Sequence, residues 1–125
     1  MVREIEAGTL SDAVRALCIE ANTVLPQDLR RAICDARQNE PSPVGQAILG
    51  DLVENYEFAE SKGLPICQDT GMAVVFMDWG QDCHLVGGSL VDAVNDGVRR
   101  GYLDGHPFHW KSRAVHVLID GQEVI

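Results

Sequence analysis

Positive charge is scarce in this 125-residue chain, which has 10 Lys and Arg against 19 Asp and Glu and a formal net charge of −9. Nucleic acids and anionic membrane surfaces are usually bound by clusters of basic residues, and the chain has no basic run. We therefore expect neither class of partner. Long apolar runs and an apolar signal region are lacking as well, so we expect no membrane span and a cytoplasmic location.

Cysteine is also sparse, and its four positions lie far apart: Cys18, Cys34, Cys67 and Cys83. A disulfide framework is not expected in a reducing compartment, so we expect free thiols or metal ligands. Apolar residues make up 46% of the chain, as in an ordinary globular protein, and this composition argues against disorder.

Regular apolar spacing predicts three helices in the first half of the chain. The first covers about 9–22 after the capping candidates Thr9 and Ser11, the second begins at Pro26 and ends near Asn39, and the third runs from Ser42-Pro43 to Lys62-Gly63. Proline at a helix start and glycine after its end are typical helix boundaries.

The second half has a mixed pattern. Residues 72–77 read as a buried strand, 80–82 as a turn and 83–86 as its partner strand; Ser89 then caps a helix to about 102, and 114–125 read as a hairpin around Asp120-Gly121. We predict one α+β domain over 1–125, helical over 1–63 and mixed over 64–125. Because the sequence stops within an apolar strand, we expect it to be a piece of a longer protein and to form homo-oligomers.

One segment, 64–71 (LPICQDTG), concentrates reactive groups between a proline and a glycine. Cys67 could ligate a soft metal or an iron–sulfur cluster, Gln68 can donate and accept hydrogen bonds, and Asp69 can act as acid, base or acceptor. Thr70 adds a hydroxyl. A plain alternative is an Asp-Thr-Gly turn with an incidental cysteine, because a single cysteine does not specify a metal site.

The same segment, followed by Val75, Phe76, Gly80, Gly87 and the helix 93–102 (AVNDGVRRGY), resembles the amino-terminal part of the class I fumarase and L(+)-tartrate dehydratase α-subunit family. The resemblance implies a [4Fe–4S] hydro-lyase acting on a four-carbon dicarboxylate. It implies that Cys67 is one of three cluster ligands, that Gln68, Asp69 and Thr70 bind substrate, and that Asp69 is catalytic. It also implies that the remaining α region and a β subunit or domain are partners.

The resemblance has two gaps. The family's other two cluster cysteines lie downstream of the resembling segment, so we expect this chain alone to be inactive and to carry no cluster. Trp110 stands where the family usually has an arginine that binds a substrate carboxylate, and neither Lys111 nor Arg113 offers the same bidentate contact.

Three alternatives remain open. The chain is a non-catalytic module that associates with itself or a partner subunit; a thiol-redox protein, although no Cys-x-x-Cys is present; or a zinc protein using Cys83 and histidines, with unfavourable spacing. In the helix 93–102, Gly97 is expected to permit close packing or a bend, and Arg99 to pair with Asp96 or Asp92.

Overall fold

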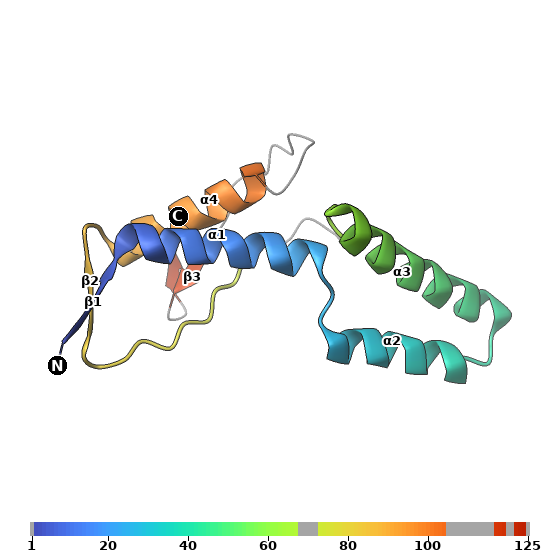
Figure 1. Ribbon diagram of the computed structural model, residues 1–125. Coiled ribbons are helices and arrows are strands. Elements are labelled where there is room, and N and C mark those ends of the chain that lie inside the picture. Colours follow the sequence, from blue (N-terminus) through green and yellow to red (C-terminus); the bar gives the residue numbers. More distant parts are fainter. Residues whose placement is uncertain (1, 68–72, 105–116, 120–121, 125) are drawn as a thin grey trace. The chain divides into compact units, whose positions relative to one another are not determined.

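The computed structural model describes residues 2–67, 73–104, 117–119 and 122–124 (Figure 1). The chain divides into two compact units, unit 1 with Met1–Ile19 and Thr70–Ile125, and unit 2 with Glu20–Asp69. Helices dominate and the strands are short, which confirms the α+β class. Within the described ranges, none of the helices combines the length and the apolar character that crossing a membrane requires.

Unit 1 contains a two-stranded parallel sheet and two packed helices. Strand β1 (Arg3–Glu6) pairs with β2 (Cys83–Val86). Helix α1 (Ala7–Thr23) contributes its residues up to Ile19, and helix α4 (Leu90–Asp104) follows Ser89. The Ser89 hydroxyl accepts a hydrogen bond from the Asp92 amide at 3.1 Å, which confirms the predicted cap.

The core of unit 1 lies where α1 meets α4. Val14 of α1 and Val94 and Val98 of α4 are at most 3% exposed, and the half-buried residues Leu10, Cys18, Ala73, Val75, Leu90 and Tyr102 pack against them. A Cβ added at Gly97 would lie 2.6 Å from the Ser11 carbonyl oxygen and 2.7 Å from Val14 Cβ. The absence of a side chain at Gly97 therefore lets the two helices approach closely, as predicted.

Three expectations for unit 1 are wrong. Residues 73–77 form no strand, although Ala73 and Val75 are half-buried and Phe76 is 94% exposed. The partner of β2 is the unpredicted β1, in parallel, and not 72–77 across a hairpin. Helix α1 begins at Ala7, so Thr9 and Ser11 lie inside it and do not cap it.

Two smaller features of the second half match the prediction. The Cys83 amide donates to the Gly80 carbonyl at 2.9 Å, which closes the predicted turn. Strands β3 (Val117–Ile119) and β4 (Gln122–Val124) pair antiparallel, as expected for the predicted hairpin. Its Asp120-Gly121 turn lies outside the described residues.

Unit 2 is built on the helical hairpin of α2 (Gln27–Asn39) and α3 (Pro43–Lys62). Both helices match the predicted ranges, with Pro26 one residue before α2. Ser42 caps α3 by accepting from the Gly45 amide at 3.4 Å, and Gly63 ends it with a φ of 62°, in the left-handed region that glycine tolerates best.

Tyr56 is the centre of the contact between α2 and α3 and is 4% exposed. Its hydroxyl lies 3.7 Å from the Cys34 sulfur, and the Arg30 guanidinium lies 5.1 Å from its ring centroid. Arg30 also donates to Glu60 at 2.6 Å. One aromatic side chain and one arginine thus join the two helices.

Candidate functional site

The end of α3 determines where the Cys67 segment begins. The Gly63 amide donates to the Glu60 carbonyl at 3.3 Å and the Leu64 amide to the Ala59 carbonyl at 2.9 Å. These two bonds form a Schellman motif, which reverses the chain at the helix end. The chain after Gly63 is therefore directed back along α3.

Two further hydrogen bonds hold this returning segment. The Ile66 amide donates to the Asn22 carbonyl at 2.8 Å, and the Cys67 amide donates to the side-chain oxygen Oδ1 of Asn55 at 2.9 Å. Asn55 lies on α3 about two helical turns, or about 10 Å, before the helix ends, and the chain from Leu64 to Cys67 is long enough to span a similar length. The reach of the segment thus explains why Cys67 meets Asn55.

Cys67 is solvent-exposed. An exposed thiol on a segment with bonded main-chain amides is open to a ligand and has a defined position. Gln68, Asp69 and Thr70, the other predicted site residues, lie outside the described residues, as does Gly71. Their substrate-binding roles and the catalytic role of Asp69 stay predictions.

The other three cysteines are half-buried, and none of the four is disulfide-bonded. Cys18 packs against the valine core of unit 1, and this burial raises the pKa of its thiol. Cys34 contacts Tyr56. Cys83 lies in β2, where its carbonyl accepts from the Trp79 indole at 2.8 Å. Cys18 and Cys34 thus have the packing contacts expected of structural cysteines.

Possible metal ligands do not gather elsewhere in the described part of the chain. No three His, Cys, Asp or Glu side chains among those residues come together in a group that could hold a metal ion. His84 lies exposed on β2, whereas His106, His109 and His116 are outside the described residues. Cys67 fits the donor chemistry of an iron–sulfur cluster as one thiolate, and a cluster there needs ligands from other residues.

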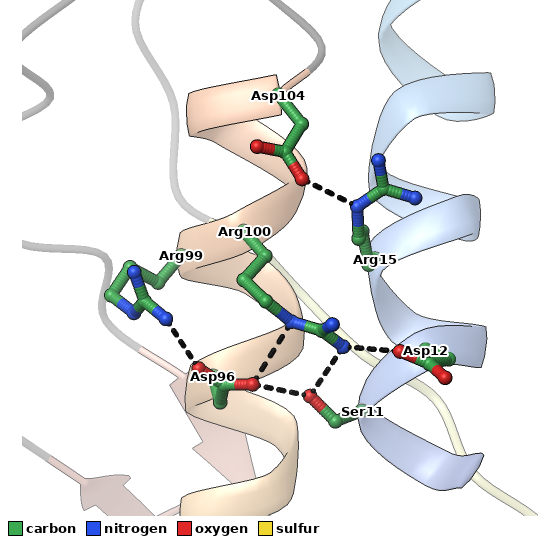
Figure 2. Close-up of polar contacts among 7 residues, drawn as sticks. All are labelled: Ser11, Asp12, Arg15, Asp96, Arg99, Arg100 and Asp104. Carbon is green, nitrogen blue, oxygen red and sulfur yellow. Dashed lines mark hydrogen bonds and ion pairs between the residues drawn. The ribbon is translucent and has the colours of Figure 1, made fainter. Parts of the chain in front are cut away.

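A polar network between α1 and α4 was not predicted (Figure 2). The Ser11 hydroxyl donates to Asp96 at 2.8 Å, and Arg99 donates to the other oxygen of Asp96 at 2.6 Å. Arg100 lies 3.0 Å from Asp96 and 2.6 Å from Asp12. The predicted pairing of Arg99 with Asp96 is therefore confirmed. Arg100 is half-buried and contacts Asp12 of α1.

Charge is balanced within this network. The hydrogen bonds from Arg99 and Ser11 hold the pKa of the Asp96 carboxyl below its ordinary value, and the bond to Asp12 raises the pKa of Arg100. A separate ion pair joins Arg15 to Asp104 at 2.7 Å. Because Arg99 and Arg100 are already bound to carboxylates, we assign them structural roles, Arg99 within α4 and Arg100 in joining α4 to α1.

Comparisons with known proteins place these features in context. A family model described as fumarate hydratase (Fumerase) matches residues 11–116. A Methanocaldococcus jannaschii protein provisionally named L(+)-tartrate dehydratase subunit alpha is 32% identical over 92 residues, which cover 73% of this chain and 32% of that protein. A Geobacillus stearothermophilus protein provisionally named class I fumarate hydratase is 41% identical over 64 residues, 50% of this chain and 12% of that protein.

Proposed function

The chain belongs to the fumarate hydratase (Fumerase) family, and from this premise we propose that it is part of a cytoplasmic iron–sulfur hydro-lyase. The enzyme adds water to, or removes it from, a four-carbon dicarboxylate such as fumarate or tartrate. The family match and the names of both relatives support this class of reaction.

The chain spans about a third of the M. jannaschii relative and 12% of the G. stearothermophilus relative. We therefore propose that the active site is completed by a further α region, which supplies two more cluster cysteines, and by a β subunit or domain. The relative's name, subunit alpha, supports such a partner. On this proposal the 125-residue chain alone is inactive and carries no cluster.

The observation that carries the proposal is the position of Cys67. Its thiol is exposed, its amide is held by Asn55, and the polar residues Gln68, Asp69 and Thr70 follow it directly. A ligand next to substrate-binding groups sets the substrate beside the metal without relying on distant side chains. This arrangement favours a functional segment over an incidental cysteine.

Each residue has a role in this proposal. Cys67 ligates the cluster, Gln68 and Thr70 bind the substrate through hydrogen bonds, and Asp69 binds the substrate and moves a proton between it and the solvent. When bound, the cluster supplies a Lewis acid for the hydroxyl group that is added or removed. Hydration then adds one hydroxide ion and one proton to neighbouring carbons, which together make up one water molecule.

The negative charge of the chain bears on how an anionic substrate is attracted. A net charge of −9 repels a dicarboxylate, and Arg99 and Arg100 are paired with carboxylates. Arg99 and Arg100 are therefore already neutralised, and we propose that the positive charge that attracts the substrate comes from the cluster or from basic residues of the completing regions.

Iron uptake tests the proposal. In the complemented preparation, this chain is produced together with the part of the M. jannaschii relative that follows its matched 92 residues, and iron and sulfide are added anaerobically. We expect about four iron atoms per chain and their loss in Cys67→Ala, with retention in Cys34→Ala, a matched control on α2. The intact relative, treated identically, is the positive control.

The outcomes separate the alternatives. If the intact relative binds iron and the complemented preparation does not, the hydro-lyase proposal fails and the non-catalytic module is favoured. If Cys67→Ala retains the iron, Cys67 is not a ligand. Faster alkylation of Cys67 than of a free thiol at neutral pH would instead favour the thiol-redox alternative.

A further inference from the structure

We propose that Asn55 is a positioning residue for Cys67. Its side-chain oxygen fixes the main chain at the cysteine, so that the thiolate approaches iron from a preformed segment. The inference rests on the proposed function, because it takes Cys67 to be a cluster ligand. Asn55 is half-buried within α3 and lies twelve positions before Cys67 in the sequence.

Each main-chain N–H group in residues 64–67 has a hydrogen-bond acceptor. Pro65 has no amide hydrogen, and the amides of Leu64 and Ile66 donate to the main-chain carbonyls of Ala59 and Asn22. The amide of Cys67 donates to the side chain of Asn55. Among residues 64–67, only the Cys67 amide donates to a side chain, so a single substitution can release it.

The residue type at position 55 also fits a positioning role. Asparagine is not a favoured residue inside a helix, because its side chain competes for main-chain hydrogen bonds. In Asn55 that capacity is directed to a different segment, where the oxygen accepts from the Cys67 amide at 2.9 Å. The bond thus gives a physical reason for asparagine at a half-buried position of α3.

The bond between Asn55 and Cys67 also bears on metal binding. Groups that orient a ligand act on metal affinity without touching the metal, and their loss typically lowers affinity by about 10- to 100-fold. Asn55 fits this role, because it holds the backbone of the ligand rather than its sulfur. It is therefore not a catalytic residue.

The first test measures hydrogen exchange at the Cys67 amide in the full chain. We expect Asn55→Ala to exchange about tenfold faster than the wild type, since one hydrogen bond is lost. Asn55→Gln keeps the side-chain amide group but displaces its oxygen, and we expect faster exchange at the Cys67 amide in this variant as well. Asn55→Asp keeps an acceptor oxygen in place and restores slow exchange.

The matched control is Asn39→Ala, which removes an asparagine on α2 whose side chain donates to the Asp35 carbonyl at 2.7 Å. We expect wild-type exchange at Cys67 in this variant. Unchanged exchange in Asn55→Ala and Asn55→Gln, or equal acceleration in Asn39→Ala, would overturn the inference. If Asn55→Ala does not fold, Asn55→Gln and Asn55→Asp decide the question.

The second test uses the complemented preparation. Iron affinity should fall about tenfold in Asn55→Ala and recover in Asn55→Asp, while Asn39→Ala matches the wild type. Faster amide exchange with unchanged iron affinity would overturn the positioning role. If the wild type binds no iron, the proposed function and the ligand role fail together, and hydrogen exchange alone still decides whether Asn55 holds the segment.

Discussion

The two units of this protein join their helices by different means. In unit 1, α1 and α4 are distant in sequence and meet through buried valines, Gly97 and a network of ion pairs. In unit 2, α2 and α3 are consecutive and meet around Tyr56. Both units contain charged and reactive side chains, but these side chains have different roles in the two units.

The two units differ in whether their reactive side chains are already paired with other side chains of the chain. In unit 1, Asp96 pairs with Arg99 and Arg100 within α4. Arg100 also pairs with Asp12 of α1, so the charges of this network stabilise α4 and join it to α1. In unit 2, the hydrogen bonds hold main-chain amides around Cys67 and leave its side chain exposed. The comparison indicates that a charge-rich cluster need not be the functional site, and that an exposed group on a held segment is a better candidate.

The largest stability effect is expected at the helix contact of unit 1. Gly97→Ala places a Cβ 2.6 Å from the Ser11 carbonyl oxygen, and such overpacking should lower the free energy of unfolding by up to about 3 kcal/mol. Gly8→Ala is the matched control, because nothing lies within 4 Å of its added Cβ. Urea titration measures both. Equal stability of Gly97→Ala and wild type would show that α1 and α4 are not in close contact.

A smaller effect is expected from truncating a core side chain. Val98 is 1% exposed, and Val98→Ala should cost about 2 kcal/mol in the free energy of unfolding. Val44→Ala, at a position 69% exposed on α3 of unit 2, should change it by less than about 0.5 kcal/mol. Similar losses in both variants, measured by urea titration, would remove this contrast between the units.

Unit 2 should weaken at alkaline pH through Tyr56. Its bond with Cys34 and its burial raise the pKa of the hydroxyl above the ordinary value, which is about 10 in an unfolded chain. The native state therefore keeps this proton to higher pH than the unfolded chain does. The contribution of the protonated Tyr56 hydroxyl to the free energy of unfolding is complete below about pH 10 and is lost as the pH rises through the native pKa. Tyr56→Phe should lack this loss and cost about 1 kcal/mol or less near neutral pH.

Circular dichroism during denaturant titrations at several pH values measures this effect. The alkaline decrease in stability should be steeper in the wild type than in Tyr56→Phe. Parallel decreases in the two proteins would mean that ionisation of Tyr56 does not make the stability of unit 2 depend on pH.

The smallest effect is expected from Asp96 at acid pH. Its pKa is lowered by Arg99 and Ser11, so its contribution is present above the unfolded pKa of about 4 and is lost as the pH falls through the native pKa. Asp96→Asn should therefore flatten the acid side of the stability curve, measured by the same titrations. An unchanged acid decrease would contradict a stabilising role for the network in unit 1.

Local sequence signals predicted the helices well. Ser42 before Pro43 and Gly63 after Lys62 delimit α3 because caps act on adjacent amides and carbonyls. The pairing of β1 with β2 was not predictable, since it joins segments about 80 positions apart and β1 is mostly charged. Residues 73–77 have alternating burial without a strand, because strand propensity cannot supply a hydrogen-bonding partner.

The same limit applies to the candidate site. The sequence identified Cys67 because its polar neighbours lie beside it, between a proline and a glycine. It did not identify Asn55, whose link to Cys67 depends on the chain reversal after α3. Nor could spacing alone show that Ser11 and Arg100, far apart in sequence, meet between α1 and α4.

The most direct test of the account is the electron paramagnetic resonance spectrum of the reduced complemented preparation. A reduced [4Fe–4S] cluster is paramagnetic, so we predict its signal in the wild type and in Cys34→Ala, and its absence in Cys67→Ala. A signal of wild-type shape and intensity in Cys67→Ala would contradict the claim that Cys67 is a cluster ligand.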